Sequence, residues 1–353
     1  MPPYAYMGVS GDNALTIIDC ANPLAPVFAG SIQGIGAPNW LGGARNVHVV
    51  GIYAYVTAQA DDSLTIIGIS NPAIPTFVSN IRAVGTLFVP RGIVVIGDYA
   101  YIATFSSLTI VDISNPLIPV LAGSIAGGGA PNFLGGVEKI HVAGNYAYLA
   151  AVADSALTII DVTNPLLPVF AGSIQGVGAP NWLGGAYGVH VVGNYAYVAV
   201  RDNDALTIID VTNPLLPVFA GSIQGAGAPN FLDRAQGVYV VGNYAYVAVD
   251  GDSALTIINI ANPLAPVFAG SIQGAGALPW LGNAREVQVR NNNAYVVAAG
   301  DNALTIIDVT NPLIPVFAGS IQGGGAPPWL DTPWDVFLLS VPTVQTDPAT
   351  EIT

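Results

Sequence analysis

Short apolar segments alternate with Gly, Pro and Asn along the whole chain, and they recur at a nearly fixed spacing. The tetrapeptide Leu-Thr-Ile-Ile, or a close variant, begins at seven positions: Leu15, Leu64, Leu108, Leu157, Leu206, Leu255 and Leu304. Successive copies are 49 residues apart, except that the second and third are 44 apart. A period of this length is typical of propellers and solenoids, in which repeats stack on one another.

One repeat, residues 188–225, predicts four strands at 189–192, 195–200, 206–211 and 218–223. A Gly-Asn turn joins the first two strands, and a polar loop joins the next two. The Asn213-Pro214 turn ends the third strand, because a proline disfavours continued pairing. Adjacent apolar residues such as Ile208 and Ile209 indicate strands that are covered on both faces. Four meandering strands per repeat are typical of a propeller blade.

The two ends of the chain carry complementary parts of one further repeat. The chain begins at Tyr4 with a second-strand sequence, and residues 334–339 have the sequence of a first strand. An open stack would need polar caps at its ends, and none is visible. We therefore predict an all-β, seven-bladed β-propeller over residues 1–340, with four antiparallel strands per blade, closed by the C-terminal strand joining the N-terminal blade. Residues 341–353 are polar and contain proline, as expected for a tail or linker.

The composition excludes several classes of function. Charged residues make up 8% of the chain against roughly 25% in ordinary soluble domains, and the net charge is −14. Such an acidic chain argues against nucleic-acid binding, which needs a basic surface. No apolar run approaches the roughly 20 residues of a membrane helix, so membrane insertion is not expected. The start of the chain lacks the regions of a signal peptide. A single cysteine, Cys20, excludes an internal disulfide and a cysteine-based zinc site.

The repeated motifs resemble those of a known family. Leu-Thr-Ile-Ile-Asp followed by Val-Thr-Asn-Pro-Leu-x-Pro-Val, with Gly-Asn-Tyr-Ala-Tyr-Val-Ala upstream, is similar to the LVIVD-repeat β-propellers, and the similarity covers nearly the whole chain. The chain departs from the family pattern in two ways. Gly68 and Asn259 replace the aspartate of the motif, and the second repeat is shortened. The resemblance implies a bacterial or archaeal protein, often at the cell surface, of a family whose members mostly have no assigned activity.

A long loop before each first strand carries an aromatic residue. This loop and the loop between the second and third strands are expected on one face, called the top. The aromatics are Trp40, Phe133, Trp182, Phe231, Trp280 and Trp329, and the short second repeat lacks one. They are either platforms for sugar rings or plugs that fill the space between adjacent blades.

The loops between the second and third strands are rich in acids. The weak candidates for a calcium site are Asp202, Asp204, Asp250 and Asp252. The other ligands of a calcium loop are missing, and Asp is also a common turn residue, so we expect no cofactor, with calcium as the alternative.

The positions where the repeats differ from one another are the sharpest indication of a site. Just before each first strand, at the mouth of the central channel, lie Arg45, Arg91, Glu138, Tyr187, Gln236, Arg285 and Trp334. Two positions into the strand lie His48, Val94, His141, His190, Tyr239, Gln288 and Phe337, whose three histidines could meet a metal or simply form hydrogen bonds. This scatter predicts either an asymmetric ligand or peptide site at the mouth, in which arginines hold a carboxylate or sulfate, or relaxed constraint at solvated positions.

No catalytic constellation is visible. The chain has neither a Gly-x-Ser-x-Gly nor a His-Glu-x-x-His motif. We expect a non-enzymatic binding or scaffolding module at the cell surface or outside the cell, contacting a ligand or a protein partner through the top face. The alternatives are a multivalent, lectin-like glycan-binding propeller and a rigid subunit of a larger assembly, which a large exposed apolar patch would favour.

Overall fold

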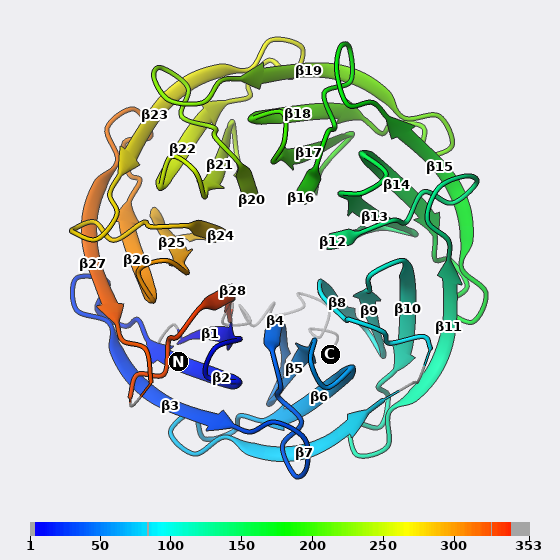
Figure 1. The fold of residues 1–353 in the computed structure, drawn as a ribbon, viewed down its shortest axis with the longest axis vertical. Coiled ribbons are helices and arrows are strands. Elements are labelled where there is room, and N and C mark those ends of the chain that lie inside the picture. Colours follow the sequence, from blue (N-terminus) through cyan, green and yellow to red (C-terminus); the bar gives the residue numbers. More distant parts are fainter. Residues whose placement is uncertain (1–3, 83–84, 326, 340–353) are drawn as a thin grey trace, which may run out of the picture.

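The computed structural model describes residues 4–82, 85–325 and 327–339, which form a closed ring of seven four-stranded antiparallel sheets with no helix (Figure 1). The sequence-based prediction of a seven-bladed β-propeller is confirmed. The predicted tail, residues 341–353, and the first three residues lie outside the described part of the chain, so the boundary at residue 340 stays a prediction.

The closing blade is assembled from both ends of the chain. Strand β28 (Pro333–Leu338) pairs antiparallel with β1 (Tyr4–Val9), with Ala5 opposite Leu338 and Met7 opposite Val336. The sheet order is β28-β1-β2-β3, so the last described strand occupies the innermost position of the first blade. The predicted closure is confirmed, and it gives the first blade the same four strands as the other blades.

In every blade the innermost strand borders the central channel, and the second strand lies behind it. The other innermost strands are β4 (Ala44–Val50), β8 (Ile93–Ile96), β12 (Val137–Ala143), β16 (Ala186–Val192), β20 (Ala235–Val241) and β24 (Ala284–Arg290). The other second strands are β5 (Tyr53–Ala58), β9 (Tyr99–Ala103), β13 (Tyr146–Ala151), β17 (Tyr195–Val200), β21 (Tyr244–Val249) and β25 (Asn293–Ala298).

The third strand of each blade carries the Leu-Thr-Ile-Ile motif, and the fourth forms the outer wall. The third strands are β2 (Ala14–Asp19), β6 (Ser63–Gly68), β10 (Ser107–Asp112), β14 (Ala156–Asp161), β18 (Ala205–Asp210), β22 (Ala254–Asn259) and β26 (Ala303–Asp308). The outer strands are β3 (Val27–Gln33), β7 (Thr76–Ile81), β11 (Val120–Ala126), β15 (Val169–Gln175), β19 (Val218–Gln224), β23 (Val267–Gln273) and β27 (Val316–Gln322).

The core consists of apolar layers between neighbouring blades. Leu206 and Ile208 of β18 are fully buried in a cluster with Val238 and Val247 of the next blade. Equivalent clusters fill the other contacts between blades, which explains why adjacent apolar residues recur in the motif.

Most innermost strands begin earlier than the sequence predicts, whereas β8 begins at Ile93. Strand β16 starts at Ala186 rather than at residue 189, because its pairing with β17 shifts by one residue between Ala186 and Gly188. Tyr187, which was expected before the strand, therefore lies within it. Neighbouring innermost strands also approach closely, since a Cβ atom placed on Gly188 would lie 2.2 Å from the carbonyl oxygen of Gln236. Glycine at such positions lets the strands converge on the channel.

Candidate functional site

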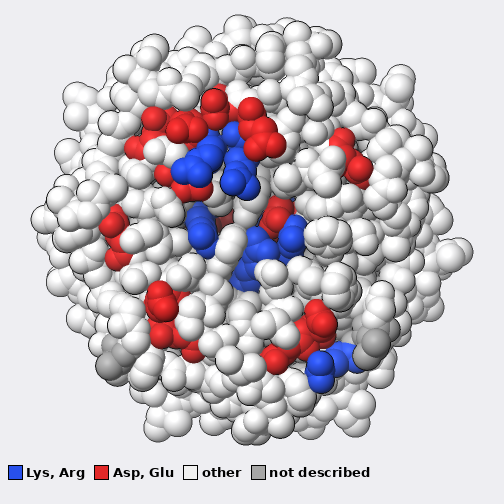
Figure 2. Space-filling view, in the orientation of Figure 1, with Lys and Arg blue, Asp and Glu red and all other residues white. Residues whose placement is uncertain are grey.

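Seven side chains, one from each blade, lie at the top end of the central channel. We call Arg45, Arg91, Glu138, Tyr187, Gln236, Arg285 and Trp334 the mouth ring. The structure brings these predicted residues together at the centre of one face, where basic groups gather in Figure 2. Three of them are buried rather than solvated, because Arg45 and Gln236 keep 5% of their surface exposed and Tyr187 keeps 7%.

One carboxylate serves two arginines of the mouth ring. Glu138 lies 2.7 Å from Nη2 of Arg45 and also forms an ion pair with Nη1 of Arg91. Arg45 donates further hydrogen bonds to Gln59 at 2.8 Å and to the hydroxyl of Tyr187 at 3.3 Å. These two guanidinium groups are therefore largely neutralised within the protein.

Trp334 lies between two arginines. The guanidinium carbon of Arg45 is 3.9 Å from its ring centroid, and that of Arg285 is 3.7 Å away. Stacking of this kind is favourable because the face of the indole ring is negative. Arg285 has no ion-pair partner among the described residues, its Nη1 atom is buried without a hydrogen bond, and burial lowers its pKa. Three arginines and one glutamate leave the mouth ring with an excess of positive charge.

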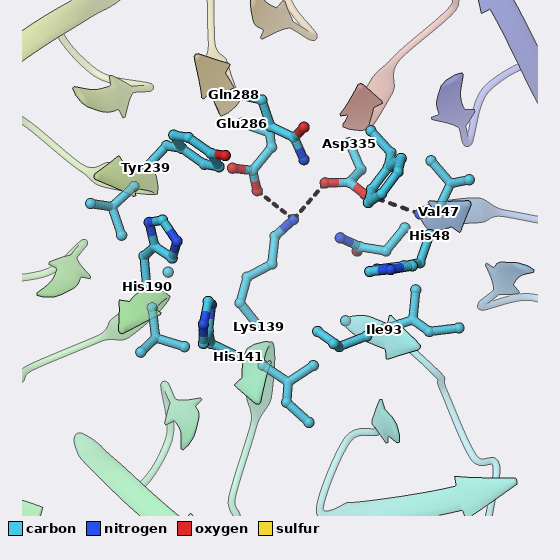
Figure 3. A pocket seen from close by; sticks show the side chains of 18 of the residues that line it. Val47, His48, Ile93, Lys139, His141, His190, Tyr239, Glu286, Gln288 and Asp335 are labelled. Carbon is cyan, nitrogen blue, oxygen red and sulfur yellow. Dashed lines mark hydrogen bonds and ion pairs between the residues drawn. The ribbon is translucent and has the colours of Figure 1, made fainter. Parts of the chain in front are cut away.

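Below the mouth ring the channel contains a cavity of about 390 Å³. Lys139 of β12 crosses the channel and lies 2.5 Å from the carboxylate of Glu286 on β24 and 3.0 Å from that of Asp335 on β28 (Figure 3). Asp335 also accepts a hydrogen bond from the backbone N–H of Val47 at 3.0 Å. Burial alone would lower the pKa of Lys139, but the two carboxylates outweigh it and raise the pKa, so Lys139 stays charged.

The walls of this cavity carry a second set of side chains that differ between the repeats. We call His48, Val94, His141, His190, Tyr239, Gln288 and Phe337 the channel ring. The rings of His141 and His190 lie 4.8 Å apart, and those of His190 and Tyr239 lie 4.7 Å apart. His190 accepts a hydrogen bond on Nδ1 from the backbone N–H of Val240 at 2.7 Å.

Burial keeps the three histidines of the channel ring uncharged. It lowers the pKa of His48 and His141 to about 4 and, together with the proximity of His141, lowers that of His190 to about 3. In the parts of the chain that the structure describes, no three His, Cys, Asp or Glu side chains are grouped as metal ligands.

Each aromatic residue of the top loops is half-buried. Its backbone is held in a left-handed conformation, with φ of 45° at Trp182 and 47° at Trp40, and its carbonyl oxygen accepts a hydrogen bond from the threonine of a Leu-Thr-Ile-Ile motif. For Thr207 and Trp182 this bond is 2.7 Å. Trp280, Trp329, Phe133 and Phe231 have the same arrangement. The motif threonine therefore fixes the loop, and the lectin hypothesis stays a prediction.

The acidic loops mostly hold the backbone of these top loops. The carboxylate of Asp252 accepts hydrogen bonds from the N–H groups of Gly227 and Asp233, and that of Asp204 accepts one from Arg234. Asp250 accepts a hydrogen bond from Gln236 and pairs with Arg234 at 3.5 Å, whereas Asp202 is exposed. Three of the four calcium candidates thus have partners in the protein.

The sequence analysis did not single out Lys139, Glu286 and Asp335 as site residues. They occupy the position after the mouth ring, where the other blades have Asn46, Gly92, Gly188 and Gly237. The same comparison between repeats that found the mouth ring would have found this layer, because its residues also differ from blade to blade.

The LVIVD repeat family matches residues 3–33, 41–82, 90–126, 134–175, 183–224, 234–273 and 281–322. The chain belongs to the LVIVD-repeat family. Each matched segment ends with or close after the outer strand of a blade, so the family's repeat follows the blades of this propeller. No curated protein matches the chain in sequence.

Among solved structures, this LVIVD-repeat chain is similar to a functionally unknown protein of Desulfotomaculum acetoxidans, with 12% identity, a TM-score of 0.71 and coverage of 95% of this chain and 98% of the other. It is also similar to the periplasmic gluconolactonase of Pseudomonas aeruginosa, with 10% identity, a TM-score of 0.72 and coverage of 97% and 100%. Apo AztD of Citrobacter koseri has 12% identity, a TM-score of 0.63 and coverage of 96% and 98%. At such low identity these similarities show the fold alone. No helix in the described ranges is long and apolar enough to cross a membrane.

Proposed function

We propose that this LVIVD-repeat propeller is a non-enzymatic binding module, exposed at the cell surface or outside the cell, that contacts a ligand or protein partner through its top face and channel mouth. The observation that carries the proposal is the placement of charge. Five of the seven arginines in this charge-poor chain surround the channel mouth: Arg45, Arg91, Arg201, Arg234 and Arg285. The bottom of each blade instead carries nearly identical turns.

The chemistry of the mouth ring suits recognition of an acidic group. Arg45 and Arg91 share Glu138, whereas Arg285 is held only by stacking on Trp334. The nearby Arg234 keeps 46% of its side chain exposed. An acidic ligand at this position would gain charge-assisted hydrogen bonds from guanidinium groups that the protein leaves incompletely paired.

The test compares Arg285→Gln with Arg82→Gln. The control arginine also stacks on a tryptophan, since Arg82 lies 4.5 Å from the ring centroid of Trp40, but it belongs to the outer part of the top face. Binding would be measured with sulfate, citrate and an array of neutral and acidic glycans, with and without calcium.

Binding of an acidic compound should weaken at least tenfold, or about 1.4 kcal/mol, in Arg285→Gln and should not change in Arg82→Gln. Equal affinity in both variants would remove the mouth from consideration. Binding that depends on calcium, or on neutral glycans alone, would favour the lectin-like alternative.

A different observation favours the assembly alternative. The Asn-Pro turns at the bottom of the blades expose large apolar side chains to between 60% and 71% of their surface: Leu24, Ile74, Leu117, Ile118, Leu166, Leu167, Leu215, Leu216, Leu264, Leu313 and Ile314. We call these residues the bottom apolar ring. Every blade contributes to it, so a second copy of the chain could meet it face to face with the same ring.

The oligomeric state tests this second candidate function. Light scattering over a range of concentrations should show a dimer that dissociates when Leu166, Leu167, Leu215 and Leu216 are replaced by Ser. The same substitutions should leave the melting temperature of the monomer nearly unchanged, because the side chains are exposed. A protein that stays monomeric at all concentrations would overturn the assembly hypothesis.

A further inference from the structure

The cavity beneath the mouth ring has properties of a ligand site separate from the proposed contact surface. Its volume of about 390 Å³ lies within the range of small-molecule sites. The mouth ring does not line it, so the walls of the cavity belong to the channel below the mouth. At the bottom, the innermost strands end in the half-exposed apolar residues Val50, Ile96, Val192 and Val241.

The charges of the cavity disfavour a charged ligand. Lys139 is its one cation among the described lining residues, and it already lies between the carboxylates of Glu286 and Asp335. An anion would meet these two carboxylates without a free cation, and a cation would have to displace Lys139. The histidines add no charge near neutral pH, because burial holds their pKa values at about 3 to 4.

The walls nevertheless offer hydrogen bonds in several directions. His190 uses Nδ1 to accept from Val240, which leaves its Nε2–H as a donor. Gln288 uses its carbonyl oxygen to accept from the backbone of Leu338 at 3.0 Å, which leaves its NH2 group as a donor. The Tyr239 hydroxyl has no hydrogen-bond partner within the described chain.

The ring nitrogens of His48 and His141 also have no hydrogen-bond partner among the described residues, and each neutral imidazole offers one donor nitrogen and one acceptor nitrogen. Figure 3 shows these groups around the circumference of the cavity rather than on one side. Apolar surface from Val94, Ile93 and Phe337 lies between them.

From this arrangement we infer that the cavity binds an uncharged, hydroxyl-rich small molecule, either a monosaccharide or a cyclic or linear polyol. Each hydroxyl of such a compound donates one hydrogen bond and accepts others, which matches separated donors and acceptors around a ring. Its C–H surfaces match the apolar walls between them. The cavity volume corresponds to roughly 13 water molecules at about 30 Å³ each, so a six-carbon polyol would fit within it together with several waters.

Two variants test the inference without disturbing the fold. Tyr239→Phe removes a hydroxyl that has no partner in the described chain, and Tyr195→Phe, on a half-buried strand position outside the cavity, is its matched control. Val94→Phe fills the cavity, and the equivalent position of the first blade carries Phe337, so the blade accepts this side chain. Melting temperatures would confirm that all three variants fold.

Titration calorimetry would use myo-inositol, D-glucose and D-mannitol, with acetate and methylammonium as charged comparisons. At least one neutral compound should bind to the protein, with no heat from the charged ones. Tyr239→Phe should weaken that binding roughly three- to tenfold, since one hydrogen bond is lost, and Val94→Phe should abolish it. Tyr195→Phe should bind like the unaltered protein.

Absence of binding by all three neutral compounds, or binding only of charged ones, would overturn the inference. Binding that survives in Val94→Phe would place the ligand elsewhere and would also overturn it. The Arg285→Gln variant separates this site from the channel mouth, because it should leave polyol binding unchanged. Loss of polyol binding in Arg285→Gln but not in Val94→Phe would assign the compound to the mouth and reject the cavity.

Discussion

The third strands and the innermost strands of the blades belong to the same sheets but have opposite degrees of variation. The third strands repeat Leu-Thr-Ile-Ile almost unchanged, and each copy packs its leucine and isoleucines between two blades with no exposed surface. The innermost strands face the channel with different residues in nearly every blade. Both kinds of strand are hydrogen-bonded within the same sheets, so backbone pairing does not explain the difference in variation.

The contrast between the two kinds of strand follows from the neighbours that their residues contact. A third-strand residue always packs on the adjacent blade, which is a near-copy, so the same side chain suits all seven positions. Residues at the channel meet one another across the axis, and seven copies of one charged residue would repel. Glu138 between Arg45 and Arg91 shows the solution, in which different blades supply complementary charges. Part of the variation at the channel mouth therefore serves pairing within the protein.

Removing the closing strand should have the largest effect, because the first blade would then have three strands and every other blade four. A chain ending at residue 332 lacks β28, which leaves β1 as an open edge and removes Asp335 from Lys139. We expect aggregation or a large loss of thermal stability, because an exposed sheet edge is a template for further pairing.

The matched control ends at residue 339 and keeps the complete blade. Its melting temperature and oligomeric state should equal those of the full chain. Unchanged melting and an unchanged oligomeric state in the chain that ends at residue 332 would contradict closure by β28.

Replacing the shared carboxylate tests the pairing across the axis. Glu138→Gln should lower the free energy of unfolding by about 3 kcal/mol, because Arg45 and Arg91 are left buried without their anion. The exposed Asp202→Asn, also on the top face, should change stability by less than about 0.5 kcal/mol. Urea unfolding would measure both.

Thr207→Val offers the comparison within the third strands. It removes one hydrogen bond to the Trp182 carbonyl and should cost about 1 kcal/mol, as should Thr158→Val and Thr256→Val in neighbouring blades. Equal costs at equivalent threonines, together with a larger cost at Glu138, would support the distinction between copied and complementary positions. An unchanged free energy of unfolding in Glu138→Gln would contradict this distinction.

The sequence predicts the fold well because every blade repeats the same local pattern. The 49-residue period, the Gly-Asn and Asn-Pro turns and the complementary chain ends are sufficient for the number of blades and their closure. The role of the motif threonine is harder to predict from the sequence, since its hydrogen-bond acceptor is a carbonyl oxygen 25 residues away in a loop without regular structure.

The candidate site is only partly predictable. Variation between repeats identifies the mouth ring and the channel ring, but it cannot show which residues pair. Lys139 and Asp335 are 196 residues apart and meet only because the ring closes. Arg285 and Glu286 are adjacent in sequence, yet Glu286 pairs with Lys139 and Arg285 stacks on Trp334. Such choices depend on side-chain direction across the channel, which a periodic pattern does not contain.

Acidification should expose a further difference between the channel and the third strands, which carry no histidine. Burial holds the pKa of His48 and His141 at about 4 in the folded protein, against an ordinary value near 6.5 in the unfolded chain. Between these values the unfolded chain binds more protons, so stability falls as the pH falls from about 6.5 towards 4.

The double variant His48→Gln and His141→Gln isolates this effect, because glutamine occurs at the same position in another blade as Gln288. The carboxyl of Glu286, whose pKa burial raises, acts in the opposite direction and is common to both proteins. Lys139 and Tyr239 also face the cavity, but both keep their protonation state in this range.

Going from pH 7.5 to pH 5.5, the unaltered protein should lose about 1 kcal/mol more stability for each histidine than the double variant does. Urea unfolding at the two pH values measures the difference. Parallel losses in the two proteins would mean that these histidines are protonated equally in the folded and unfolded chain, and hence that the channel ring is more open to water than its packing indicates.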